Sequence, residues 1–234
     1  MNYNKIKKEI LKKASAKRAK SNEWFFKTGI GQYGEGDKFI GISMPNLRIL
    51  AKKYQDISFK DIEKFFKSKI HEERMFALIV LTYQFEKAEK KVQEKIYKFY
   101  LKNTKYINNW DLVDTSAHKI VGAYIQQKPK AILKKLVRSK NMWERRIAVI
   151  ATFQLIKMGR LKETFELSKM LLTDDHDLMH KAVGWMLREA GKKDIKKLEA
   201  FLKKNHAHMP RTMLRYSIEK FPEAKRKKYL KGIV

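Results

Sequence analysis

Residues 73–79 read ERMFALI and residues 144–150 read ERRIAVI, so similar stretches recur 71 positions apart (144 − 73 = 71). A third stretch, HKAV at 180–183, resembles RIAV at 146–149 after a further 34 positions (180 − 146 = 34). Each stretch arranges apolar side chains around an alanine at the spacing of a helix. The sequence therefore indicates a chain that is built from repeats of one helical unit.

The three stretches share a small residue that marks the centre of each helix: Ala77, Ala148 and Ala182. The same spacing predicts two further helix centres near Val113 and Tyr216. The repeat is then 34 to 36 residues long (182 − 148 = 34; 113 − 77 = 36), which is enough for a pair of helices. A helix pair of this size cannot bury its apolar face alone, so neighbouring pairs must stack.

This repeat length lies between those of tetratricopeptide and HEAT repeats, and the aromatic signature of the tetratricopeptide repeat is missing. The chain has only four prolines and ten glycines, which leaves few residues that break helices. We therefore predict an all-α fold, a right-handed α-α superhelix (solenoid) of HEAT-like repeats, in which residues 1–234 form a single domain.

The charge of the chain is strongly positive, with 54 Lys and Arg against 25 Asp and Glu and a net charge of +29. Such a charge attracts polyanions and makes their binding depend on salt. The excess is concentrated at both ends, whereas residues 71–100 are almost neutral, a pattern that uniform compositional drift would not produce. Nucleic acid is therefore the favoured partner.

Several classes of protein are excluded by composition. The chain has no cysteine, so it has no disulfides, thiolate metal sites or cysteine nucleophile. Its N-terminus reads as a basic amphipathic helix, and the longest apolar run, Met75–Leu81, is far shorter than the roughly 20 residues that span a bilayer. We expect a monomeric cytoplasmic protein that does not bind membranes and that associates with the nucleoid when it is bound to DNA.

A glycine-rich segment at residues 28–41 interrupts the helical pattern and holds five of the ten glycines. Its GxGxxG at 29–34 resembles a dinucleotide fingerprint, but that fingerprint follows a strand, whereas a helix is expected just before this one. We predict instead a small β-hairpin at about 29–42. With Tyr33 near its tip and Lys38 beside it, the hairpin could enter a DNA groove. The other interpretation is a loop that only joins two helices.

The stretch WDLVD at 110–114 suggests a site for a positive charge. Trp110 and Asp114 are four residues apart, so on a helix they share one face. An indole and a carboxylate side by side attract a cation, the ring through its quadrupole and the carboxylate through its charge. We expect Asp111 to serve the helix N-terminus instead.

The histidines offer no comparable site. His176 and His180 are four residues apart and could bind a metal on one helix face, but no third ligand is identifiable. The neighbouring aspartates are explained by a cap at the helix N-terminus. We expect neither a metal nor a cofactor.

Three stretches then carry a family resemblance: WDLVD at 110–114, WERRIA at 143–148 and KAVGWMLRE at 181–189. They resemble the signature stretches of the AlkD-type DNA alkylation repair proteins, which are HEAT-like-repeat alkylpurine DNA glycosylases. The resemblance runs through essentially the whole chain. It implies a hydrolase that cuts the N-glycosidic bond of cationic N3- or N7-alkylated purines in double-stranded DNA.

The resemblance also implies a role for each site residue. Asp114 would be the catalytic carboxylate, which stabilises the sugar cation and orients water. Trp110 and Trp185 would contact the lesion nucleotide with their ring faces, and Arg146 would hold the DNA backbone. In this family the damaged base need not be flipped into a pocket. The residues expected to contact DNA are Tyr33, Lys38, Arg145, Arg146, Arg188, Arg211 and Arg215.

The glycine-rich segment departs from the shortest members of the family. A branch of the family has a hairpin at this place and is associated with DNA binding more than with base excision. The alternative function is therefore a non-catalytic HEAT-repeat protein that binds damaged, bent or branched DNA.

Overall fold

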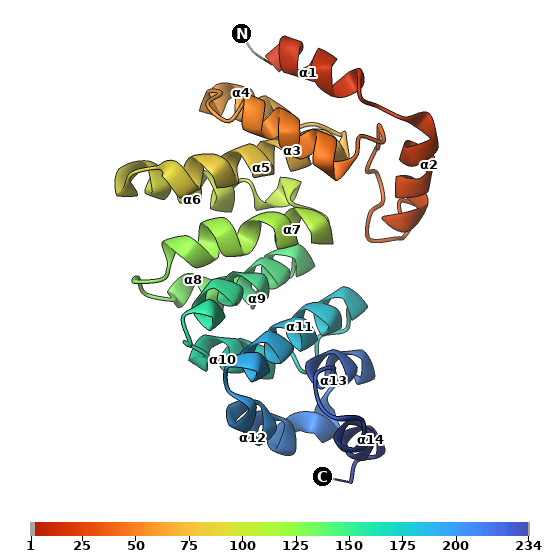
Figure 1. Ribbon diagram of the computed structural model, residues 1–234, viewed down its shortest axis with the longest axis vertical. Helices are drawn as coiled ribbons and strands as arrows, with labels where there is room; N and C mark the ends of the chain where they lie inside the picture. The colour runs from red at the N-terminus through yellow and green to blue at the C-terminus, as the bar shows by residue number, and fades with distance from the viewer. Residues whose placement is uncertain (1–2, 234) are drawn as a thin grey trace. The chain divides into compact units, whose positions relative to one another are not determined.

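The structure is a computed structural model and describes residues 3–233 (Figure 1). Within this range the chain forms fourteen α-helices and no β-strand, which confirms the prediction of an all-α fold. None of the helices in the described range is long and apolar enough to cross a membrane.

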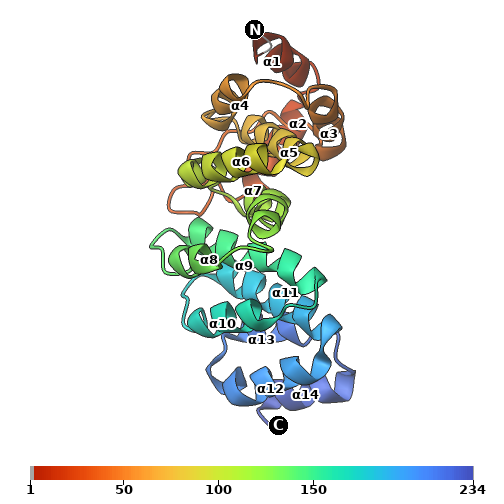
Figure 2. The same ribbon diagram turned by 90° about the vertical axis from the view of Figure 1, so that its left-hand side faces the viewer.

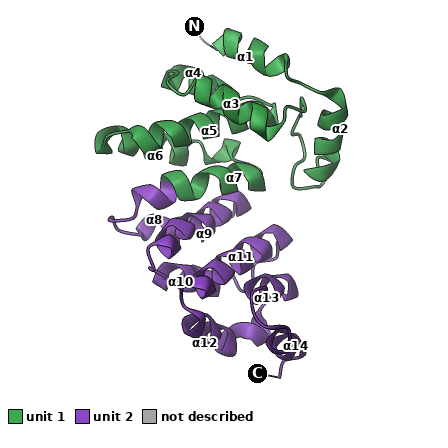
Figure 3. Ribbon diagram, in the orientation of Figure 1, with its two compact units in different colours: residues 1–120 green, residues 121–234 purple. Residues whose placement is uncertain are grey.

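The helices cluster into two compact units, residues 1–120 and residues 121–234 (Figure 3). The helices of the first unit are α1 (Tyr3–Leu11), α2 (Ala16–Phe25), α3 (Met44–Lys53), α4 (Phe59–Phe66), α5 (His71–Lys87), α6 (Lys90–Lys102) and α7 (Trp110–Ala117). Those of the second unit are α8 (Ala131–Leu136), α9 (Met142–Lys157), α10 (Lys162–Met170), α11 (Asp177–Lys193), α12 (Ile195–Asn205), α13 (Arg211–Ser217) and α14 (Glu223–Lys231). A π-helical turn, His118–Gly122, follows α7.

The repeat predicted the positions of five helices, three from the similar stretches of sequence and two from their spacing. The five expected centres lie on α5, α7, α9, α11 and α13, so every second helix carries one. Four of the centres are fully buried: Ala77, Val113, Ala148 and Ala182. Tyr216 on α13 is half-buried. Two points stay predictions: that these helix pairs are HEAT-like repeats, and that the whole chain is one domain.

Each unit has its own core. In the first unit α5 packs against α3, α4 and α7, and the apolar run Met75–Leu81 on α5 is buried throughout. In the second unit α11 packs against α9, α12 and α13. Figure 2 shows α3 beside α5 in one unit and α9 beside α11 in the other. The predicted centres Ala77 and Ala182 thus lie on the helices, α5 and α11, against which several other helices of their unit pack.

The prediction of a β-hairpin at about 29–42 is wrong. Residues 28–37 form a series of turns, and Lys38 makes an isolated parallel bridge with Ile70 instead of pairing with residues 30–33. The His71 N–H donates to the Lys38 carbonyl at 2.8 Å. The backbone groups that a hairpin would use are therefore bound to the chain just before α5.

Side chains of α5 explain why this pairing is preferred. The Glu72 carboxylate accepts hydrogen bonds from the backbone N–H groups of Ile40 (3.1 Å) and Gly41 (2.8 Å). Phe39 and Ile42 are buried in the core of the first unit. Hydrophobic burial and a charged acceptor at the helix N-terminus together outweigh the pairing of two short strands.

The start of α2 lies directly on this segment. The Ser15 N–H donates to the Ile40 carbonyl at 2.9 Å, and the Arg18 guanidinium donates to the Gly41 carbonyl at 3.0 Å. Gly41 has a φ of +76°, and a Cβ there would lie 2.1 Å from the Ser15 carbonyl oxygen. Only glycine allows this approach, so Gly41 determines where α2 is held.

Gly41→Ala tests this close approach, with Gly31→Ala as the matched control. Gly31 has nearly the same φ, +74°, but a Cβ there would meet nothing within 4 Å. Backbone strain should cost both variants about 1–2 kcal/mol, and the clash should cost Gly41→Ala roughly 1–3 kcal/mol more. Equal losses in urea unfolding would contradict the close approach.

Candidate functional site

Trp110 and Asp114 lie one turn apart at the start of α7. Asn109 caps this helix, because its side-chain oxygen accepts a hydrogen bond from the Trp110 N–H at 2.8 Å. Leu112 and Val113 are buried, whereas Trp110 and Asp114 are half-buried. The structure therefore places the indole and the carboxylate on one helix with part of each accessible.

The Trp110 indole is supported by two phenylalanines at the end of α2, the last helical residue Phe25 and the next residue Phe26. The Phe26 ring stacks on it at a centroid distance of 5.4 Å and an angle of 22°. The Phe25 ring meets it edge-on at 6.0 Å. Phe26 in turn stacks on Phe39 at 5.0 Å. One face of the indole is thus covered by a column of aromatic rings, which restricts its orientation.

His71, the first residue of α5, is held between two carboxylates. Its Nδ1 lies 3.0 Å from Asp37 Oδ2, and its Nε2 lies 2.8 Å from Asp111 Oδ2. An ionised carboxylate only accepts hydrogen bonds, so both ring nitrogens must carry protons to satisfy both contacts. We call this group of His71, Asp37 and Asp111 the His71 clamp.

The His71 clamp is buried, since His71 is only 2% exposed. Burial by itself lowers the pKa of His71, but the carboxylate of Asp111 and the hydrogen bond to Asp37 raise this pKa to about 9. Burial likewise raises the pKa of Asp37, but His71 and Arg74 bring the pKa of Asp37 below its usual value of 3.8. Both partners are therefore charged at neutral pH.

Asp37 connects the clamp to two parts of the first unit, the first turn of α5 and the residues just before α7. Arg74 on α5 donates to its Oδ1 at 2.6 Å. Asn108 and Asn109, just before α7, donate to its two oxygens at 3.5 and 3.4 Å. The glycine-rich segment that carries Asp37 is thereby attached to the N-termini of both α5 and α7.

The carboxylate of Asp114 influences a buried phenol of the first unit. Tyr100 on α6 is fully buried, and its hydroxyl lies 2.9 Å from Ser116 Oγ. Burial raises the pKa of Tyr100 and the negative charge of Asp114 raises it further. Tyr100 therefore stays protonated at neutral pH.

In the second unit both arginines of α9 are already engaged. Arg145 makes a two-pronged ion pair with Asp174, with its Nε 2.6 Å from Oδ2 and an amino nitrogen 3.2 Å from Oδ1. Arg146 is 4% exposed and donates to the Leu178 carbonyl on α11. The two side chains thus connect α9 to α11 and to the loop before it.

Trp185 on α11 is half-buried and contacts the Phe153 ring of α9 at 6.0 Å. The glycine before it is required by packing, because a Cβ on Gly184 would lie 2.5 Å from Tyr216 Cβ and 2.6 Å from the Met213 carbonyl. The close contact of α11 with α13 therefore explains why the residue before Trp185 is a glycine.

The other residues predicted to contact DNA differ in their exposure and in their bonding partners. Lys38, Arg211 and Arg215 are exposed. Arg188 pairs with Glu219 and Glu189. The Tyr33 hydroxyl donates to the Phe25 carbonyl at 3.4 Å, so this side chain turns back to α2 and is not at the tip of a hairpin.

Sequence reasoning missed the His71 clamp. It assigned Asp111 to the helix N-terminus, where Asp111 Oδ1 does accept a hydrogen bond from the Leu112 N–H at 2.8 Å, but it gave no role to Asp37 or His71. The three residues are 34 and 40 positions apart (71 − 37 = 34; 111 − 71 = 40) and belong to no spaced motif. A residue that sequence alone could have marked is Asp37, since an aspartate in a glycine-rich turn often binds backbone or charge.

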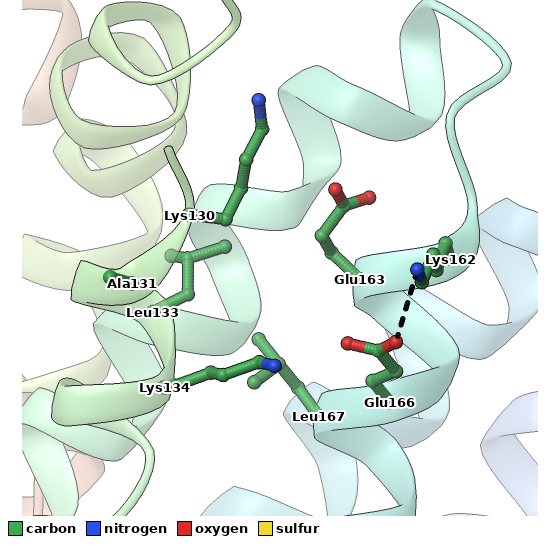
Figure 4. Close-up of a pocket in the computed structure, with 8 residues that line it drawn as sticks. All are labelled: Lys130, Ala131, Leu133, Lys134, Lys162, Glu163, Glu166 and Leu167. Carbon is green, nitrogen blue, oxygen red and sulfur yellow. Dashed lines mark ion pairs between the residues drawn. The ribbon is translucent and has the colours of Figure 1, made fainter. Parts of the chain in front are cut away.

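In the described residues no group of three His, Asp or Glu side chains is arranged to hold a metal. A hollow of about 320 Å³ between α8 and α10 is shown in Figure 4, where Lys162 pairs with Glu166 at 3.9 Å. Five lysine and glutamate side chains line it together with Ala131, Leu133 and Leu167, and no predicted site residue is among them. This hollow therefore has the character of a solvated surface.

Comparison with known proteins identifies the family. A sequence model described as "DNA alkylation repair enzyme" matches residues 6–221. The chain belongs to the DNA alkylation repair enzyme family. A solved structure, described as a predicted DNA alkylation repair enzyme from Enterococcus faecalis, shares the fold with a TM-score of 0.72 at 16% identity. The match covers 90% of this chain and 98% of the other. No curated protein matches the sequence.

Membership of the DNA alkylation repair enzyme family gives the chain a role in DNA repair, with DNA as its substrate. The net charge of +29 agrees with a polyanionic partner. The family match includes α7 and the glycine-rich segment, so Trp110, Asp114 and the His71 clamp all lie within it.

The His71 clamp should make stability depend on pH above neutrality. A histidine whose pKa is raised from 6.5 to about 9 stabilises the fold fully below pH 6.5, and this contribution is lost as pH rises through 9. The free energy of unfolding of the wild type should therefore fall across this interval. His71→Ala should be roughly 3–5 kcal/mol less stable at pH 6, and the difference should shrink as pH rises.

Urea unfolding at a series of pH values measures this difference. His208→Ala is the control, because His208 is exposed and should follow the wild type. A constant difference between the wild type and His71→Ala from pH 6 to 9 would show that His71 is not the titrating group.

Proposed function

We propose that this protein is a DNA glycosylase, which hydrolyses the N-glycosidic bond of cationic N3- or N7-alkylated purines in double-stranded DNA. The observation that carries the proposal is the pair on α7. A half-buried indole, fixed by stacking on Phe26, lies one helical turn from the half-buried carboxylate of Asp114. This is a site for a positive charge in a chain that attracts phosphates.

The chemistry of the lesion suits such a site. When the bond between C1′ and the purine nitrogen breaks, its electron pair leaves with the base. The base, positively charged until then, becomes neutral, and the positive charge passes to the deoxyribose. A neutral leaving group needs no strong general acid, so the enzyme has to stabilise the sugar cation and supply water.

We assign both tasks to Asp114. Its carboxylate attracts the developing sugar cation and accepts a hydrogen bond from water, which orients the water oxygen toward C1′. The oxygen bonds to C1′ and the water proton is released. At about 4 Å and an effective dielectric constant of 20, this attraction is worth about 4 kcal/mol. Trp110 contributes the negative face of its ring beside the same charge.

From the second unit we assign Trp185 to the lesion nucleotide and Arg146 to the DNA backbone, as the family resemblance implies. Because Arg146 is buried and donates to the Leu178 carbonyl, its replacement should also lower the stability of the second unit. Asp114 is therefore the residue whose replacement tests the chemistry most cleanly.

Asp114→Asn should reduce base release on the order of 100- to 1000-fold, because it removes the anion but keeps the size of the side chain. The measurement is release of 7-methylguanine and 3-methyladenine from alkylated duplex DNA in single-turnover conditions. Asp56→Asn, an exposed aspartate of the same unit, is the control and should release both bases at the wild-type rate.

Two results would overturn parts of the proposal. Equal release by Asp114→Asn and the wild type would remove Asp114 from the reaction. No release by the wild type would exclude glycosylase activity on these lesions and would favour a protein that binds damaged, bent or branched DNA without cutting it.

A further inference from the structure

None of the residues of helix α2 is buried, and the helix exposes large apolar side chains. Trp24 is 74% exposed and Phe25 is 53% exposed. Ile30, in the turns after the helix, is 95% exposed. Figure 1 shows α2 beside the ends of α3, α5 and α7 in the first unit. A helix that presents its aromatic residues to solvent is typical of a binding surface.

Positive charges surround these aromatic residues. The cations on α2 and directly after it are Lys17, Arg18, Lys20 and Lys27, and the segment from Ala16 to Lys27 has a single acid, Glu23. Lys27 Nζ lies 4.8 Å from the centre of the Trp24 ring. The surface therefore fits a partner that combines negative charge with flat apolar groups.

The shape of the surface supports the same conclusion. An open hollow of about 780 Å³ lies along α2 and is lined by Lys17, Lys20, Ser21, Asn22, Trp24 and Phe25. Along α2, Lys17 and Lys20 come first, and Trp24 and Phe25 lie at the C-terminal end of the helix. A ring could lie against Trp24 while an anionic chain follows the lysines.

The helix is held firmly in this position. The close approach of Ser15 to Gly41 fixes its start, and Asn22 donates to Glu72 at 3.4 Å. Phe26, next to its end, stacks on Phe39 and Trp110. The exposed residues are therefore presented by a fixed helix, which lowers the entropy cost of binding.

The surface is also continuous with the candidate site. Phe25 meets the Trp110 ring edge-on at 6.0 Å, and Trp24 is the residue before it. A strand of DNA that places a lesion at Trp110 would bring its neighbouring nucleotides to α2.

We propose that Lys17, Lys20 and Trp24 form a binding site for an unpaired nucleotide of the DNA substrate, in which the base stacks on Trp24 and the lysines hold the flanking phosphates. A paired base inside a duplex has both faces covered, so only an unstacked base can take this place. Stacking of a base on an aromatic side chain is sequence-tolerant and strong enough to dominate such a contact. This inference rests on the proposed function only for DNA being the substrate.

Binding of unmodified oligonucleotides tests the site without any base release. The probes are a fully paired fluorescein-labelled duplex and the same duplex with one unpaired thymidine. The wild type should bind the second more tightly, and Trp24→Ala should lose roughly 5- to 100-fold in affinity for it. Trp24→Phe should keep most of the preference. Ile49→Ala removes another exposed apolar residue of the first unit and should bind like the wild type.

Intrinsic fluorescence supplies a second reading. A base that stacks on Trp24 should quench the emission of the wild type more than that of Trp24→Phe. If Trp24→Ala binds both duplexes like the wild type, the proposal is overturned. It is also overturned if vesicles that contain phosphatidylserine, and not DNA, change the Trp24 emission, because the surface would then belong to a membrane.

The release assay on alkylated duplex separates this proposal from the glycosylase proposal. Release by the wild type together with loss of the unpaired-base preference in Trp24→Ala supports both. If the wild type releases no base but Trp24 still determines the preference, the glycosylase proposal fails and the α2 site stands.

Discussion

The imidazolium of His71 between Asp37 and Asp111 is the interaction on which the first unit depends. A buried cation is costly unless it is paired on every side that carries a proton. Here each N–H has its own carboxylate, and the ring face lies against Phe39 at 4.6 Å. Because Asp37 belongs to the glycine-rich segment and Asp111 to α7, one side chain holds both elements against the start of α5.

The clamp also determines what the surface of the first unit can bind. His71 contacts Phe39 and Phe26, and Phe26 supports the Trp110 indole. The glycine-rich segment, which contains Phe39, also contains Gly41, and the start of α2 packs against Gly41. The accessible face of Trp110 and the exposed face of α2 are therefore two consequences of one buried arrangement. Lesion recognition and base stacking, as proposed, use side chains whose positions follow from the His71 clamp and the rings packed on it.

Much of the helical architecture could be predicted from the sequence, because the repeat depends on local periodicity. The predicted helix centres Ala77, Ala148 and Ala182 lie on α5, α9 and α11. The pair Trp110 and Asp114 could be found for the same reason, since four residues make one helical turn. The hairpin could not be excluded, because its competitor is the Glu72 carboxylate. The His71 clamp joins residues far apart in sequence, and no local pattern predicts such contacts.

Nitrogen NMR of the histidine side chains tests most directly whether His71 is a buried cation at neutral pH. Both ring nitrogens of His71 should show the shifts of a doubly protonated imidazolium at pH 7.5, and titration should begin only as the pH approaches about 9. A His71 ring that is neutral at pH 7.5, with one nitrogen unprotonated, would contradict the clamp. One carboxylate would then lack its hydrogen bond, and His71 would not hold α7 and the glycine-rich segment together.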